Sequence, residues 1–202
     1  MAKDMRFRSV LMFGGPGTGK GTQGVVIGQL PNLVHLAMGD IFRGLDKESD
    51  IGREFLSYST QGLLVPDELT VRVFRHHVDG RVAGGAIDRD YHTLVLDGIP
   101  RTAAQVELLT DAIDVRCVVH LVMEDVDALV ARLVKRAAKS NRPDDADEAV
   151  IRNRIEVYER ETTPVLEAFP KKLIVRINAD QPPLCVLRDI ADSLNGFVSS
   201  NV

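Results

Sequence analysis

A run of glycines around one lysine, Gly14-Gly15-Pro16-Gly17-Thr18-Gly19-Lys20-Gly21-Thr22, has the composition and spacing of a loop that binds phosphate. It follows the apolar run 10–13, which predicts a buried strand, and precedes a stretch that predicts a helix. Backbone N–H groups and the helix dipole make such a junction attractive to anions. Gly21 stands where the pattern expects Ser or Thr, but the hydroxyl of Thr22 is available for a metal ion or a phosphate. A simple glycine-rich turn is the alternative, and the flanking strand and helix disfavour it.

A second candidate is Asp97, which ends the apolar run 94–96. An aspartate there resembles the second acidic motif of phosphate-loop NTPases, whose carboxylate holds Mg²⁺ directly or through water. An aspartate that only caps the turn after the strand is the alternative. Arg101 follows, and the amide of Gln105, one helical turn further on, could read an adenine edge. The bond between Ile99 and Pro100 could be cis and force a sharp turn.

Arginines form a third signal. Arg132 and Arg136 are spaced to share one helix face, where like charges repel unless an anion lies between them. Arg142 lies in a polar loop and Arg154 on the next helical stretch, so a polyphosphate partner is a reasonable hypothesis. Arg43, one turn into a short helix that follows Gly39, could grip a phosphate with two hydrogen bonds. For each arginine taken alone, a solvated surface residue is the alternative.

The elements that must position these residues alternate along the chain. Apolar runs rich in Val, Leu and Ile predict strands at 10–13, 33–36, 93–96, 117–122 and 173–177. Amphipathic patterns predict helices at 21–30, 67–78, 102–113, 126–139, 148–169 and 183–195. This alternation predicts a three-layer α/β/α fold with a five-stranded parallel sheet, in which ligands bind beyond the carboxyl ends of the strands.

Composition sets further limits. The 202 residues suit one domain, and 45% hydrophobic and 27% charged residues are typical of a globular protein. A net charge of −4 disfavours nucleic acid as a partner. Cys117 and Cys185 form no zinc motif or disulfide framework, which favours a reduced, cytoplasmic setting. The N-terminal residues predict neither a signal peptide nor a membrane span.

With these motifs in this order, the chain resembles the adenylate kinase family of nucleoside monophosphate kinases, from about Phe7 to Leu194. The family also keeps glycine at the position of Gly21. The resemblance rests on the following segments: Gly14–Gln23, Gly39-Asp40 with Arg43, Leu64–Glu68, Asp97–Thr102 with Gln105, Arg132–Asp145, and Arg154 with Tyr158 and Thr163-Pro164.

The resemblance implies a P-loop NTPase fold and a reversible reaction in which MgATP and AMP give two ADP. It implies an AMP-binding insertion at 38–67, a short lid at 135–145, and a core formed by 1–37, 68–134 and 146–202. It implies that Mg²⁺ is held by Asp97 and Thr22, through water. The ATP-binding residues it implies are Gly15, Gly17, Thr18, Gly19, Lys20, Gly21, Thr22, Arg132, Arg136 and Gln181.

For AMP, the resemblance implies contacts with Met38, Gly39, Arg43, Leu63, Leu64, Val65, Gly98, Ile99, Pro100, Arg101, Gln105, Arg142 and Arg154. The catalytic set it implies is Lys20, Arg101, Arg132, Arg136, Arg142 and Arg154. These charges would stabilise the transferring phosphoryl group, and closure of the lid and the AMP-binding insertion would exclude water. We expect a monomer, because nothing in the sequence demands an interface.

Two departures from the family bear on base selection. Ala37-Met38 replaces the usual Ser-Thr, and Ile99 replaces a phenylalanine that usually follows the aspartate and glycine. A UMP/CMP kinase of the same fold is therefore one alternative, although Gln105 favours adenine. A nucleotide sensor that has lost catalysis is another, which the retained Lys20 and Asp97 disfavour. A simple NTPase switch would leave the AMP-side arginines unexplained.

Overall fold

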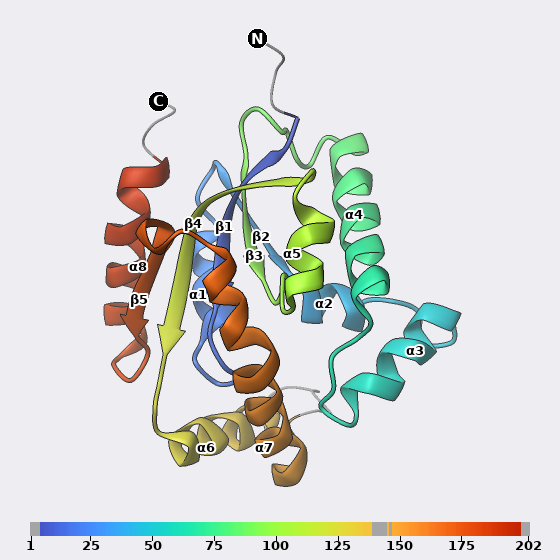
Figure 1. Ribbon diagram of the computed structural model, residues 1–202, viewed down its shortest axis with the longest axis vertical. Coiled ribbons are helices and arrows are strands. Elements are labelled where there is room, and N and C mark those ends of the chain that lie inside the picture. The colour runs from blue at the N-terminus through green and yellow to red at the C-terminus, as the bar shows by residue number, and fades with distance from the viewer. Residues whose placement is uncertain (1–4, 139–144, 146, 199–202) are drawn as a thin grey trace.

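Five short runs of mainly Val, Leu and Ile form one parallel sheet with the strand order β2-β3-β1-β4-β5 (Figure 1). The structure is a computed structural model that describes residues 5–138, 145 and 147–198. The predicted three-layer α/β fold with a five-stranded sheet is confirmed. The strands are β1 (Phe7–Phe13), β2 (Leu33–Ala37), β3 (Thr93–Asp97), β4 (Ile113–Val122) and β5 (Ile174–Asn178).

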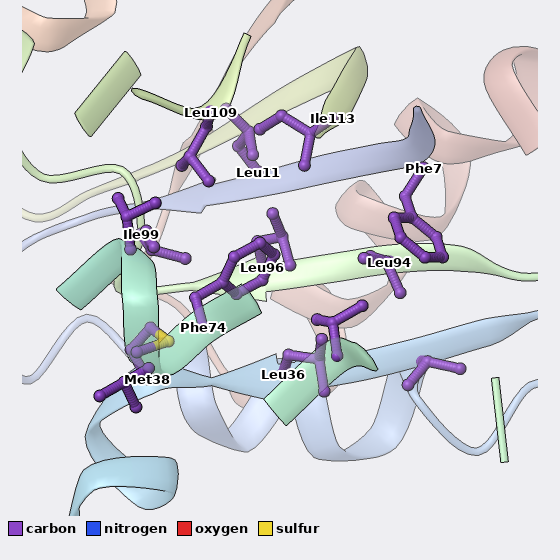
Figure 2. Packing of buried hydrophobic residues seen from close by; sticks show 14 of the residues in the cluster. Phe7, Leu11, Leu36, Met38, Phe74, Leu94, Leu96, Ile99, Leu109 and Ile113 are labelled. Atoms are coloured by element: carbon purple, nitrogen blue, oxygen red, sulfur yellow. The ribbon is translucent and has the colours of Figure 1, made fainter. Parts of the chain in front are cut away.

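Helices cover both faces of the sheet because the central strands are apolar on both sides. Leu11 and Phe13 of β1 pack into one cluster with α2 (Met38–Arg43), α4 (Asp67–Ala83) and α5 (Ala103–Leu109). Val10 and Met12, which alternate with them, face α1 (Lys20–Ile27) and α8 (Pro183–Val198). In the first cluster, Phe74 of α4 packs with Leu36 and Leu96 of the sheet (Figure 2).

Three further helices lie beyond the carboxyl ends of the strands (Figure 1). They are α3 (Asp50–Ser59), α6 (Val126–Ala137) and α7 (Glu148–Val157). The helices α6 and α7 share a small apolar cluster of their own, built around Leu133 and Ile151, neither of which is measurably exposed. They can therefore form one side of a ligand site without being part of the main core.

The strand register brings three strand ends side by side. Met12 of β1 and Ala37 of β2 both lie opposite Asp97 of β3. The residues that follow these strands are the glycine-rich loop, the start of α2 at Met38 and the turn that begins at Gly98. Three segments that contain predicted site residues therefore meet at one edge of the sheet.

The predicted helix 102–113 is too long. The Thr102 side chain caps α5 by accepting a hydrogen bond from the Gln105 N–H, but the helix ends at Leu109. Ile113 pairs with Phe7 in β4, and the Phe7 N–H donates to the Ala112 carbonyl at 2.8 Å. Residues from Ile113 onward therefore pair with β1 and do not continue the helix, although the sequence pattern there is helical. As a result, β4 begins four residues before the predicted position at 117.

The predicted single helix 148–169 is also wrong. After α7 the backbone continues as a π-helix, η2 (Tyr158–Thr162), then as 3₁₀ turns, η3 (Thr163–Ala168) and η4 (Lys171–Leu173). Pro164 has no N–H to donate, so a regular α-helical ladder cannot run through this segment. The sequence reading also missed α3, whose start is capped by the Ser49 side chain accepting from the Gly52 N–H.

In the part of the chain that the structure describes, no helix combines the length and the apolar character needed to cross a lipid bilayer.

Candidate active site

A cleft of about 600 Å³ lies at the carboxyl ends of the strands and collects most of the residues that the sequence singles out. Its walls come from the glycine-rich loop, α2, the turn after β3, and the helices α6 and α7. The predicted site residues that line it are Gly17, Gly19, Lys20, Gly21, Thr22, Met38, Gly39, Arg43, Leu63, Leu64, Val65, Asp97, Gly98, Pro100, Arg101, Gln105, Arg136 and Arg154.

The glycine-rich loop has the backbone of an anion cradle. Gly17 and Gly19 have φ angles of 87° and 97°, in the left-handed region where glycine is favoured. No side chain caps the first turn of α1, so its N–H groups remain available to a ligand. Lys20 reaches back over the loop, and its Nζ donates to the Gly14 carbonyl at 2.5 Å and to the Gly15 carbonyl at 3.2 Å.

Positive charge dominates the region around Lys20. Burial lowers the pKa of the Lys20 ammonium to about 8; Asp97 opposes this shift, whereas Arg101, Arg154 and Arg136 strengthen it. Burial likewise lowers the pKa of Arg101. One lysine and three arginines therefore converge on a weakly hydrated site, which is an arrangement suited to a ligand with several negative charges.

An acidic residue that the sequence reading did not single out organises two of these arginines. The side chain of Asp145 is fully buried, and its Oδ2 accepts from Nε of Arg136 at 2.6 Å. Its Oδ1 accepts from Nη2 of Arg136 at 2.9 Å and from Nη1 of Arg154 at 2.6 Å. Burial pushes the pKa of Asp145 upward, but the two guanidinium groups outweigh it, so the net shift is downward. The anion between these arginines in this structure is thus a carboxylate of the protein.

Asp97 lines the cleft, and its carboxylate could hold Mg²⁺. Its side chain is 13% exposed, and its Oδ2 lies 3.9 Å from Nε2 of His35. A Cβ at Gly21 would lie 3.8 Å from the same carboxylate oxygen, so glycine leaves room beside it. Thr22 lines the same cleft and adds a hydroxyl. Oxygen donors of this kind suit Mg²⁺, which commonly takes one or two carboxylates and completes its shell with water and substrate phosphates.

The described residues form no group of three or more His, Cys, Asp or Glu side chains that could hold a metal ion by themselves. Asp97 and Thr22 could hold an ion whose other ligands are water and substrate phosphates.

The other end of the cleft is more apolar. Met38 is 2% exposed and begins α2, and Phe42 stacks on Phe55 of α3 with ring centroids 4.9 Å apart. Arg43 ends α2, and its Nη2 donates to Oδ1 of Asp40 at 2.5 Å. This end could hold a flat apolar group, with a cation beside it.

The turn after β3 joins the two ends of the cleft. The peptide bond between Ile99 and Pro100 is cis, which confirms the prediction from the sequence. Nε of Arg101 donates to the Gly98 carbonyl at 3.1 Å, which turns the guanidinium back toward the strand ends. Gln105 is 1% exposed; its Oε1 accepts from the Arg101 N–H at 2.8 Å, and its Nε2 donates to Asp67 at 2.8 Å. One N–H and one lone pair of this amide remain for a ligand.

Five predicted site residues do not line the cleft. Thr18 is internal to the loop, where its hydroxyl donates to the Gly15 carbonyl at 2.8 Å, and Gly15 packs against Tyr158. Ile99 is 2% exposed and belongs to the apolar core in Figure 2, because its side chain turns toward α4 and α5.

The other two lie near the end of β5. Arg132 donates to the Ala179 carbonyl at 3.0 Å and to Asp180 at 3.3 Å. Gln181 donates to the Asn178 carbonyl and to Asp189, at 2.9 and 2.6 Å. The predicted Arg142 lies outside the described residues.

Thr162, at the end of η2, is a further residue of the cleft that sequence reasoning missed. The four-residue spacing from Arg154 to Tyr158 and on to Thr162 was the signal that could have found it, because it continues one helix row.

The chain is similar to known proteins over most of its length. The family model described as adenylate kinase matches residues 12–174. An adenylate kinase of Kocuria rhizophila is 37% identical over 176 residues, which cover 84% of this chain and 89% of that protein. An adenylate kinase of Bifidobacterium longum is 37% identical over 175 residues, covering 84% and 90%. One from a Synechococcus strain is 33% identical over 195 residues, covering 93% and 96%.

Proposed function

Because the chain belongs to the adenylate kinase family and is a nucleoside monophosphate kinase, we propose that its cleft binds MgATP at the glycine-rich loop and AMP between α2 and the turn after β3. The observation that carries this assignment is the convergence of Lys20, Arg101 and Arg154 between those two regions. The reaction is the reversible transfer of the terminal phosphoryl group of ATP to AMP, which yields two ADP.

The proposed mechanism needs no general base, since the attacking phosphate of AMP is already anionic. Lys20 contacts the transferring and leaving phosphates, and Arg101 and Arg154 neutralise charge on the transferring group. Arg136 supports the ATP side and is held in place by Asp145. Arg43 grips the phosphate of AMP after exchanging its contact with Asp40. Asp97 and Thr22 would hold Mg²⁺ through water, and the ion would supply further charge neutralisation when it is bound with ATP.

Water must be kept from the transferring group, or ATP would be hydrolysed. We propose that 38–67 forms the AMP-binding insertion and 135–145 the lid, and that both close on the substrates. α2 and α3 lie within the first of these segments, whereas most of the second lies outside the described residues. Arg132 and Gln181, which do not line the cleft in this structure, join the ATP contacts in this closed state. The assignment of Arg142 to AMP stays a prediction. The monomeric state and the cytoplasmic location stay predictions.

Base selectivity is the property that best tests the assignment. In a coupled assay with MgATP and AMP, CMP, UMP or GMP in turn, we expect AMP to give the highest kcat/KM. The reason is that Gln105 keeps one amide N–H and one lone pair at the apolar end of the cleft, which can pair with an adenine edge. Met38 supplies bulk without a hydroxyl, so we expect discrimination against other bases of about 10–100-fold, the range that apolar contacts provide.

The same assay separates the alternatives. Highest turnover with CMP or UMP would assign the chain to the pyrimidine branch of this fold and contradict adenine selection by Gln105. ATP binding without transfer to any acceptor would instead support a nucleotide sensor. Gln61→Ala is a suitable control for a substitution of Gln105, because Gln61 is exposed and its side-chain amide bonds, among the described residues, only to the Ser57 carbonyl.

The lowered pKa of Lys20 leads to a prediction about pH. We expect kcat/KM for MgATP to fall about tenfold per pH unit above pH 8, because the free enzyme loses the Lys20 charge there. Bound phosphates favour the charged ammonium and raise its pKa, so kcat should stay constant to a higher pH. Phosphate groups titrate near pH 6, so their ionisation does not contribute to the change above pH 8.

Steady-state kinetics from pH 6.5 to 10 would measure both profiles. The residual activity of Lys20→Arg provides the control, because a guanidinium stays charged throughout this range and the fall above pH 8 should disappear. A wild-type kcat/KM that stays constant up to pH 10 would contradict the role assigned to Lys20.

A further inference from the structure

Two buried hydroxyl groups in the cleft have no evident partner. The hydroxyl oxygens of Tyr158 and Thr162 are shielded from solvent, yet neither makes a hydrogen bond within the described part of the chain. The backbone of Gly14 and the side chain of Thr163 lie close to the Tyr158 hydroxyl, but they do not meet it with hydrogen-bond geometry. Buried polar groups are nearly always paired, so these two require an explanation.

The local backbone places both residues in the wall of the cleft. Tyr158 and Thr162 begin and end the π-helix η2, in which the Thr163 N–H donates to the Tyr158 carbonyl five residues earlier. Arg154, Tyr158 and Thr162 follow one another at four-residue intervals, and all three line the cleft. Short π-helical segments are often found at functional sites because they redirect side chains.

Tyr158 also contacts the glycine-rich loop. A Cβ at Gly15 would lie 3.5 Å from Cδ1 of Tyr158, so the ring packs against the backbone of the loop. Burial raises the pKa of Tyr158 above its ordinary value, partly offset by nearby groups that include Arg101. The hydroxyl therefore stays protonated at neutral pH and can act as a donor beside the proposed phosphate site.

We propose that Tyr158 and Thr162 are ligand-binding residues whose hydroxyls gain hydrogen-bond acceptors only when the phosphate chain of a nucleotide occupies the cleft. The acceptors are phosphate oxygens or water molecules held by them. This inference rests on the proposed function, because it needs a polyphosphate ligand at the glycine-rich loop. In the ligand-free protein the hydroxyls contribute nothing to stability, whereas in the complex they strengthen binding.

A hydroxyl that bonds only in the nucleotide complex, and not in the ligand-free protein, can be distinguished from one with a purely structural role. The variants Tyr158→Phe and Thr162→Val remove each hydroxyl and keep nearly the same shape. We expect the melting temperature of each ligand-free variant to equal or exceed that of the wild type, because an unpaired buried hydroxyl is removed. We expect the affinity for a bisubstrate analogue, two adenosines joined by five phosphates, to fall about tenfold in Tyr158→Phe, as for loss of a hydrogen bond to a charged group.

Thermal melting and calorimetric titration, with MgATP alone and with the analogue, provide the measurements. Tyr91→Phe and Thr110→Val are matched controls, because both side chains are exposed and neither lines the cleft. Unchanged affinity in both cleft variants would overturn the proposal. So would a lower melting temperature of ligand-free Tyr158→Phe, since the hydroxyl would then have a partner without nucleotide.

Failure of the proposed function would look different. In that case the wild-type protein itself would show no stabilisation by MgATP or by the analogue, whatever the variants do.

Discussion

Replacing Lys20 with methionine is expected to lower kcat for phosphoryl transfer about a thousandfold, equivalent to roughly 4 kcal/mol of transition-state stabilisation. Lys20 is the one ammonium inside the glycine-rich loop, where its Nζ lies against the carbonyls of Gly14 and Gly15. Methionine retains most of the length of the side chain and removes the charge. The measurement is a coupled assay with saturating MgATP and AMP.

The stability of Lys20→Met, in contrast to its activity, should not fall. The lowered pKa of Lys20 means that keeping it protonated in the folded state is unfavourable at pH 7, so Lys20→Met should melt no lower than the wild type. Lys172→Met is the matched control, because Lys172 is exposed just before β5 and should leave kcat unchanged. Wild-type kcat in Lys20→Met would contradict the role assigned to Lys20. If Lys20→Met instead melted well below the wild type, misfolding would explain any loss of activity.

Arg154→Met is expected to have the second largest effect, a loss of about 100- to 1,000-fold in kcat/KM for AMP. The side chain runs along the turn at Gly62, where a Cβ would meet its Cγ at 2.8 Å, and its Nη1 bonds to Asp145. It therefore lies between the AMP side of the cleft and Lys20, where charge develops on the transferring group. Among the described residues, the substitution also leaves Asp145 with Arg136 as its one arginine partner.

Arg152 offers a control on the same helix. It is exposed and paired with Asp127 and Glu148, away from the cleft, so Arg152→Met should keep wild-type kinetics. If Arg154→Met changed the melting temperature but not kcat/KM for AMP, Arg154 would be a structural partner of Asp145 only. Measuring the rate as a function of AMP concentration and, separately, of ATP concentration shows which substrate the Arg154 charge contacts.

The sequence predicted the fold well because the alternation of apolar runs and amphipathic stretches leaves few architectures open. It predicted the limits of the elements less well where no glycine or proline marks an end. Thr110–Ala112 carry no strong stop signal, so the helix was extended into the start of β4, where pairing with Phe7 decides the conformation. The π-helix at Tyr158–Thr162 could not be predicted either, since amphipathic spacing is similar in α- and π-helical turns.

For the site, motifs of adjacent residues were predictable and contacts between distant ones were not. The glycine-rich loop and the turn after Asp97 lie at predicted strand ends, and the register confirms that they meet. Asp145 was missed because nothing in the sequence shows that its carboxylate lies between Arg136 and Arg154. The bonds of Arg132 and Gln181 near the end of β5 depend on tertiary packing in the same way.

The central place of β1 in the sheet has a consequence for how the protein is made. β1 leaves the ribosome before the other four strands of the sheet, but its neighbours are β3 and β4, which end at Asp97 and Val122. A nascent chain that carries only the first 90 residues contains the whole glycine-rich loop and no partner for the strand that supports it. Nucleotide can therefore stabilise the chain only after β3 and β4 have been translated, and until then the unpaired strand is exposed to aggregation.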